Sequence, residues 1–244
     1  MGRTGVRIGR RAVLVGTLVA LTTGCGSGTP TNPSTPGSTG TADPRPDLRA
    51  RLADALRPVD PQSADLVAEP VSTLSVVPTD WLPGWQVVDV QNARLAHPRR
   101  FFAGLSPDGT VAYLTGHPEA FDAMVRAAGV RVDDAGTAGR LVAAHLDSTR
   151  AFRTYFYRVA STADIAWLPD PTADQRRARH RLERAYADRV AEPSLRRSGD
   201  GWTLHVWMVD GQTLVDHTVT VAADGGVADE ARVAERDLPV PVSV

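Results

Sequence analysis

Residues Trp202–Val221 constrain the fold of this chain more than any other stretch. Apolar and polar residues alternate on both sides of Asp210-Gly211, a pattern typical of two antiparallel strands joined by a two-residue turn. If these two residues form the loop, Val209 lies opposite Gln212, and the residue numbers of every opposed pair add up to 421. One face of the hairpin is then largely apolar, so it must be buried against another element.

Three polar residues of this hairpin are the candidate site residues. With the pairing above, His205 lies opposite Asp216, and a carboxylate beside an imidazole is the part of a catalytic triad that orients the base. A cross-strand charge pair worth about 0.2–1 kcal/mol is the competing interpretation. His217 falls on the apolar face, either as a core histidine or as a residue of a ligand pocket.

The sequence assigns no residue to catalysis, to a cofactor or to a metal. No Gly-x-Ser-x-Gly motif provides a nucleophile for His205 and Asp216. The six histidines show no His-Glu-x-x-His spacing, so no zinc site is expected. We therefore expect no cofactor, and the sequence leaves enzymatic activity undecided.

The rest of the chain predicts an α+β fold, with helices packed on a twisted antiparallel sheet. Residues 226–235 add a third strand to the hairpin, which makes a C-terminal three-stranded meander. We expect residues 47–134 to form an N-terminal α+β part and residues 135–244 a C-terminal one, as one domain or as two. Helices are expected at 47–57, 117–128, from 137 onward and at 172–190, and strands at 71–77, 85–90, 101–106, 110–114 and 152–159.

The N-terminal residues have the pattern of an export signal. Four arginines precede an apolar run of about ten residues, Ala12–Leu21, which ends in small residues. A membrane-spanning helix needs roughly 20 apolar residues, so this run is too short to cross a bilayer. Residues 1–24 are therefore expected to be a cleaved signal peptide.

The residues around the expected cleavage site indicate the type of signal. Leu21-Thr22-Thr23-Gly24-Cys25 resembles the lipobox of bacterial lipoproteins, in which the cysteine is lipidated and becomes the mature N-terminus. The leucine lies four residues before Cys25, whereas the family usually has it at three. An ordinary secretory signal with an incidental cysteine is the alternative, but Cys25 is the only cysteine, which favours lipidation.

The resemblance implies a protein held on the extracytoplasmic face of the cell membrane by its lipid. Residues 25–46, rich in Gly, Ser, Thr and Pro, are then expected to be a flexible tether. Arg10-Arg11 also resembles the core of a twin-arginine signal, so both the general and the twin-arginine export routes stay open. The Ala- and Arg-rich composition without lysine resembles lipoproteins of high-GC actinobacteria.

Charge and export together narrow the class of partner. Removal of residues 1–24 leaves 23 basic and 28 acidic side chains, a net charge of −5, which argues against nucleic-acid binding. The leading hypothesis is a binding module for a protein or wall polymer at the cell envelope. The alternatives are an envelope hydrolase that uses His205 and Asp216, and a small-ligand carrier with a cavity around His217 between helix and sheet.

Overall fold

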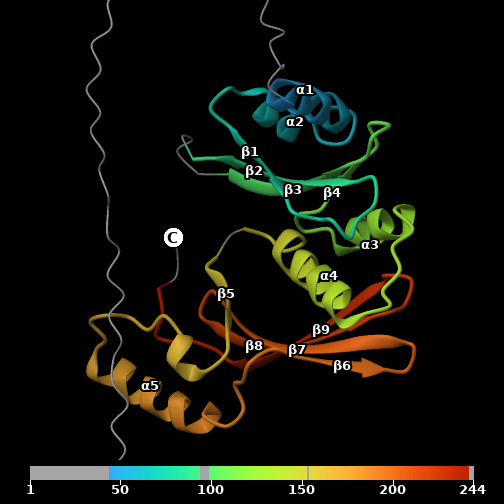
Figure 1. Ribbon diagram of the computed structural model, residues 1–244. Helices are drawn as coiled ribbons and strands as arrows, with labels where there is room; N and C mark the ends of the chain where they lie inside the picture. Colours follow the sequence, from blue (N-terminus) through green and yellow to red (C-terminus); the bar gives the residue numbers. More distant parts are fainter. Residues whose placement is uncertain (1–43, 94–98, 153, 242–244) are drawn as a thin grey trace, which may run out of the picture. The chain divides into compact units, whose positions relative to one another are not determined.

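The chain folds into α-helices and two antiparallel sheets, and the architecture is of the α+β class (Figure 1). The computed structural model describes residues 44–93, 99–152 and 154–241. The expected signal peptide, Cys25 and the tether up to residue 43 lie outside the described residues. None of the helices in the described ranges is both long enough and apolar enough to cross a membrane.

The first sheet has the strand order β1-β2-β3-β4 and is covered on one face by α1 and α2. Strand alternation sends Val88, Val90 and Phe101 toward these two helices, where they meet Leu52 and Leu56. The bounds of these elements are α1 Pro44–Leu56, α2 Pro61–Ala68, β1 Thr73–Val77, β2 Gln86–Asn92, β3 Arg99–Leu105 and β4 Val111–Tyr113.

Helix α2 is not among the helices expected from the sequence, which end at residue 57 and begin again at 117. Asp60 instead caps a new helix, because its carboxylate accepts hydrogen bonds from the backbone N–H groups of Gln62 and Ser63 (3.1 and 3.2 Å). Pro61 suits the first helical turn, where its missing N–H costs nothing.

The second sheet has the order β5-β7-β8-β9, with β6 also paired to β7. The expected C-terminal three-stranded meander is confirmed as β7-β8-β9. Helix α5 covers one face, where Leu182 and Tyr186 pack with Trp207 and Val209. The bounds of the remaining elements are α3 Pro118–Ala127, α4 Ala135–Ser148, β5 Phe156–Val159, α5 Ala173–Tyr186, β6 Ser194–Ser198, β7 Gly201–Asp210, β8 Thr213–Val221 and β9 Val227–Glu235.

Helices α3 and α4 lie between the two sheets (Figure 1). Their apolar sides form one core cluster with the inner faces of both sheets, which joins Phe102 of the first sheet to Met208 of the second through Met124 and Leu141. Both expected α+β parts contribute to this cluster, and all described residues belong to one compact unit.

The turn of the β7–β8 hairpin corrects the expected pairing. Gly211-Gln212 forms the loop, Asp210 lies opposite Thr213, and opposed residues add up to 423 instead of 421. Gly211 has a φ of +55° and Gln212 does not have a positive φ, which suits a turn with glycine at its first central position. Moving the loop by one residue shifts every partner by two, so each residue keeps its face and changes its neighbour.

The expected pair of His205 and Asp216 is therefore wrong. His205 lies opposite Thr218, whose Oγ1 is 3.2 Å from the histidine Nδ1. Asp216 lies opposite Trp207 on β7 and opposite Arg232 on β9, and its Oδ2 accepts a hydrogen bond from the Arg232 guanidinium (3.0 Å).

Candidate ligand cavity

A cavity of about 820 Å³ opens between helices α3 and α4 and strands β8 and β9. This volume lies within the range of about 300–1,000 Å³ that is usual for small-molecule sites. His217, one of the three residues singled out from the sequence, lines it, whereas His205 and Asp216 do not. The other charged or titratable side chains in the lining are Glu119, Asp122, His145, Arg150, Asp210, Asp229 and Arg236.

His217 is held in place by a carboxylate of the neighbouring strand. Its Nδ1 lies 2.9 and 3.0 Å from the two carboxylate oxygens of Asp229. The side chains of His217 and Asp229 are 10% and 21% exposed, so solvent screens the pair only in part. Because Nδ1 faces the carboxylate, Nε2 is the ring nitrogen left to bind another group.

Asp229 was missed in the sequence because its partner depends on the length of the β8–β9 turn. Val221 pairs with Val227, so five residues form that connection and Ala231 lies opposite His217. Asp229 is thus the diagonal neighbour of His217, within reach of a side chain on the same face. The Asp224-Gly225-Gly226 pattern indicates a turn but not its length.

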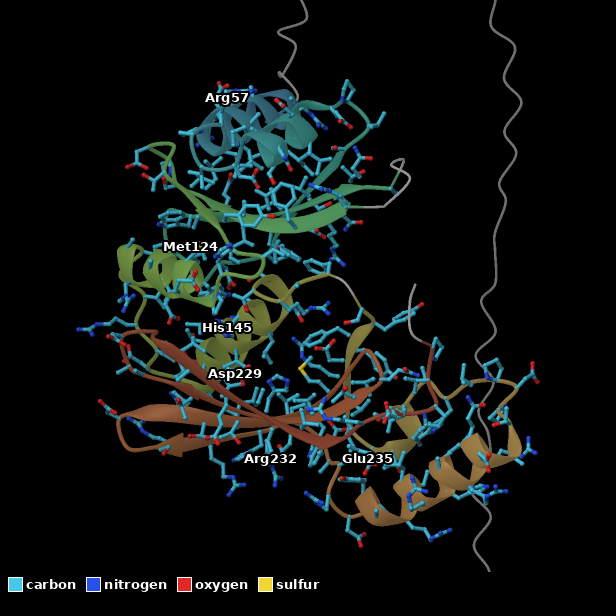
Figure 2. The ribbon with its side chains drawn as sticks, turned by 180° about the vertical axis from the view of Figure 1, so that it is seen from behind. Arg57, Met124, His145, Asp229, Arg232 and Glu235 are labelled. Atoms are coloured by element: carbon cyan, nitrogen blue, oxygen red, sulfur yellow. The ribbon has the colours of Figure 1, made fainter. Side chains whose placement is uncertain are left out.

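His145 of α4 is the second histidine of the cavity, and Figure 2 shows it facing β9, which carries Asp229, across the space between helix and sheet. It is buried, and its ring packs edge-on against Phe121 with ring centroids 5.2 Å apart. Burial lowers the pKa of His145, which outweighs the opposite effect of Asp122 and Asp229. Its Nδ1 is buried without a hydrogen-bond partner in the described part of the chain.

His145 is not among the candidate residues that the sequence indicated, because a lone histidine in a helix matches no motif. Its spacing from Ala138, Leu141 and Val142 places it on the buried stripe of α4. That spacing is readable from the sequence, and it is the signal that could have identified His145.

Asp122 lies at the end of the cavity where β9 begins. Its Oδ1 accepts a hydrogen bond from the backbone N–H of Val227 (3.3 Å), which links α3 to β9. Burial raises the pKa of Asp122, although Val227, His145 and Arg126 act in the opposite direction.

Arg150 lies at the opposite end, beside Phe156, Asp210 and Thr213. Its guanidinium carbon is 3.6 Å from the ring centroid of Phe156 and 4.9 Å from that of Phe152, which is a cation–π arrangement. Burial lowers the pKa of Arg150 to about 10, so the side chain is still charged at neutral pH.

The carboxylates that act on Arg150 have other partners. Asp147 pairs with Arg158 (2.7 Å), and Asp210 accepts a hydrogen bond from Thr154 (2.6 Å). The Arg150 Nε is buried with no hydrogen-bond partner among the described residues. The guanidinium is therefore fixed in orientation by aromatic rings without a neutralising contact in the described ranges.

The cavity can bind polar groups, but its lining contains no serine or cysteine to act as a nucleophile. The hydroxyl groups at its wall belong to Thr149, which donates a hydrogen bond to the His145 carbonyl (2.8 Å), and to Thr213. Within the described ranges, no group of three or more His, Cys, Asp or Glu residues is placed to hold a metal ion. The geometry thus suits binding through charges and hydrogen bonds.

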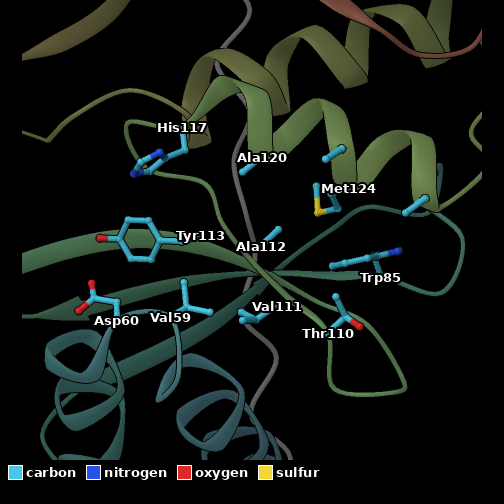
Figure 3. A pocket seen from close by; sticks show the side chains of 12 residues that line it. Val59, Asp60, Trp85, Thr110, Val111, Ala112, Tyr113, His117, Ala120 and Met124 are labelled. Carbon is cyan, nitrogen blue, oxygen red and sulfur yellow. The ribbon is translucent and has the colours of Figure 1, made fainter.

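A second hollow of about 670 Å³ lies between β4, α3 and the segment that joins α1 to α2. Figure 3 shows Ala112, Ala120 and Met124 along it, with Trp85 at one end and Asp60 and His117 at the other. This hollow is mainly apolar, and its titratable groups, Asp60, Tyr113 and His117, lie together at one end. It is the weaker of the two candidates for a polar ligand.

Comparison with protein-family models finds no match for this chain, and comparisons with curated proteins and with solved structures find none either. The cavity must therefore be interpreted from its own residues.

Proposed function

We propose that the folded part of this protein binds a small polar ligand in the cavity between α3–α4 and β8–β9. We further propose that the chain is a lipoprotein, held on the extracytoplasmic face of the cell membrane by a lipid on Cys25. Among the functions considered from the sequence, the proposal favours the small-ligand carrier with a cavity around His217.

The proposal rests on polar groups in the cavity wall whose burial lowers the stability of the folded protein. Leaving a buried polar atom such as the His145 Nδ1 without a partner costs about 1–3 kcal/mol. The raised pKa of Asp122 likewise means that its ionised form is destabilised in the folded protein. A helix needed only for packing would carry apolar residues at such positions, and polar groups retained at a cost in stability are typical of functional sites.

The exposed apolar residues give less support to a protein partner. The large hydrophobic side chains exposed in the described ranges are Val59, Val71, Val76, Tyr155 and Val233. Val59 lines the second hollow and Val233 the cavity, while Val71, Val76 and Tyr155 lie outside both, whereas a docking face for a protein usually presents a contiguous apolar patch. The alternative of an envelope hydrolase has no support from the hairpin, because His205 and Asp216 do not pair.

Ligand binding can be tested on the mature protein with a library of small polar metabolites. A binder should raise the melting temperature of the wild type and shift the ring resonances of His217 and His145. The same compound should have much less effect on His217→Leu. His205→Leu is a matched control, because it makes the same change on the opposite face of the hairpin, and it should bind as the wild type does.

Two results would contradict the ligand site. One is a library without any compound that shifts His145 or His217, and the other is a binder whose effect is equal in His217→Leu and the wild type.

The anchor has its own test, which does not depend on the cavity. Cys25→Ser should move the protein from the membrane fraction to the periplasm or medium, whereas Thr29→Ala should leave it in the membrane. Retention of the Cys25→Ser protein in the membrane would exclude the lipid on Cys25 as the anchor.

A further inference from the structure

The cavity has charges of opposite sign at its two ends, and their order follows from the pairing of β8 with β9. Thr213 begins β8, and Arg236 follows the last residue of β9, so both lie at the end of the cavity that contains Arg150. Val227 begins β9 opposite Val221, and it binds Asp122 at the other end.

Asp229 lies on the Asp122 side of the cavity, two residues along β9 from Val227. Its carboxylate is oriented by His217, and its side chain is 21% exposed, so one edge of the carboxylate can receive a further donor. Glu119 also lines the wall, but it lies at the start of α3, on the side of Thr149, and its carboxylate is 2.9 Å from the His117 ring. With Asp122 and Asp229, the Asp122 end therefore suits a cationic or hydrogen-bond-donating group.

The Arg150 end suits an anionic group. A guanidinium has its donors in a planar fork that matches the two oxygens of a carboxylate. The stacking of Arg150 on Phe156 fixes the plane of this fork, and its charge has no ion-pair partner among the described carboxylates. Asp210 also lines this end, but it is already engaged by Thr154.

From these observations we propose that the ligand is a short peptide-like zwitterion, with its carboxylate at Arg150 and its ammonium group at Asp122 and Asp229. This inference rests on the proposed function of the cavity and names the chemical class of its ligand. Between the charged ends, Nε2 of His217 provides a hydrogen-bonding group for amides, and Leu146 and Val215 provide apolar wall.

The register also limits the length of the ligand. Thr213 and Val219, the residue opposite Asp229, are six residues apart on β8, which corresponds to about 20 Å at the usual rise of an antiparallel strand. The Asp229 carboxylate reaches back to Nδ1 of His217, which is four residues from Thr213 on β8, and this leaves about 13 Å. An extended peptide spans about 3.3–3.6 Å per residue, so three or four residues fit and a single amino acid cannot reach both ends.

The test uses the mature wild-type protein and a randomised tetrapeptide library in four forms: both ends free, N-acetylated, C-amidated, and capped at both ends. The protein is immobilised, and the peptides that it retains are quantified by mass spectrometry. We expect each single cap to reduce retention at least about tenfold, because each removes one desolvated charge contact. The doubly capped library should be retained least.

The variants assign each end of the peptide. Arg150→Met should reduce retention of the free library at least about tenfold and leave retention of the amidated library unchanged. Asp122→Asn should have the same effect on the free library and none on the acetylated one. Arg150→Lys restores the charge without the planar fork and should recover part of the binding. Arg181→Met is the control, because Arg181 is an exposed residue of α5 that does not line the cavity.

Equal retention of all four libraries, or equal loss of the free and amidated libraries in Arg150→Met, would overturn the zwitterion. If a neutral metabolite meanwhile shifts the His145 and His217 resonances, the cavity still binds ligands and only the class is wrong. If neither peptides nor metabolites shift those resonances, the proposed function fails as well.

Discussion

Two spaces in this molecule are built in the same way, each with helices on one face of an antiparallel sheet, but their contents differ. Between α1–α2 and the first sheet, Leu52, Leu56, Val88 and Val90 are fully buried in an apolar cluster. Between α3–α4 and the second sheet, His145 and His217 are buried beside an open cavity of about 820 Å³.

The buried polar groups of the two spaces also differ in their partners. Near α2, Ser72 donates a hydrogen bond to the Leu66 carbonyl (2.6 Å), and Asn92 donates to the Glu69 carboxylate (2.6 Å). Beside the cavity, the Nδ1 of His145 has no partner in the described part of the chain. The space near α1 and α2 therefore contributes packing to the fold, whereas under the proposed function the cavity retains polar groups for a ligand.

The largest expected effect is a loss of stability from a substitution in the apolar cluster between α1–α2 and the first sheet. Leu56→Ala should lower the free energy of unfolding by about 2–5 kcal/mol, because it removes a fully buried side chain and leaves a void. Denaturant unfolding measures this loss. Val59→Ala, at a position that is 59% exposed, should change stability by less than about 0.5 kcal/mol. Equal effects of the two substitutions would contradict the burial of Leu56.

A substitution beside the cavity should raise the free energy of unfolding instead of lowering it. His145→Leu should raise the free energy of unfolding by about 1–2 kcal/mol, because it replaces a buried unpaired nitrogen by an apolar group of similar size. It should also weaken ligand binding. His205→Leu, on the face of the hairpin that carries Trp207 and Val209, is the reference for a histidine outside the cavity. A clear loss of stability in His145→Leu would mean that Nδ1 is satisfied and contributes to packing.

The pH dependence of stability should distinguish His145→Leu from the wild type. Because burial lowers the pKa of His145 below its ordinary value of 6.5, the unfolded chain binds this proton more readily than the folded one. The contribution of the neutral His145 ring to the free energy of unfolding is therefore fully present above pH 6.5 and is lost as the pH falls through the lowered pKa. His145→Leu should show less loss of stability below pH 6.5 than the wild type. Parallel pH curves for the two proteins would argue against this titration.

The smallest expected effect tests the hairpin register. Asp216 and Arg232 form a pair whose side chains are 20% and 64% exposed, so a double-mutant cycle should give a coupling of about 0.2–1 kcal/mol. A cycle for His205 and Asp216 should give a smaller coupling, because these residues are only diagonal neighbours and contact Thr218 and Arg232 instead. Coupling in the second cycle and none in the first would restore the pairing expected from the sequence.

Much of the fold could be predicted from local patterns. The expected strand at 226–235 corresponds to β9, and the capping box at Thr172 and Gln175 marks the start of α5. The hairpin pattern also placed His217 on the buried face correctly, because side chains alternate with a period of two whichever turn is used. The error in the turn therefore changed the partners of His217 but not its location beside the cavity.

The turn itself was decided by contacts with distant segments. The backbone N–H of Gly211 donates to the Tyr155 carbonyl (2.7 Å), and Leu238 N–H donates to the Gln212 carbonyl (2.9 Å). The side chain of Gln212 in turn donates to the Leu238 carbonyl (3.2 Å). These contacts favour Gly211-Gln212 as the loop over Asp210-Gly211, and neither segment is adjacent to the hairpin in the sequence.

The sequence by itself determined the α+β class, the faces of the β7–β8 hairpin and the resemblance of the N-terminus to a lipoprotein signal, because all three depend on neighbouring residues. The tertiary structure alone decided which polar groups share the cavity. Asp122, His145, Arg150, His217 and Asp229 come from α3, α4, the segment after α4, β8 and β9. They converge because α3 and α4 pack between the two sheets, and the free energy of that packing depends on contacts between residues far apart in the chain.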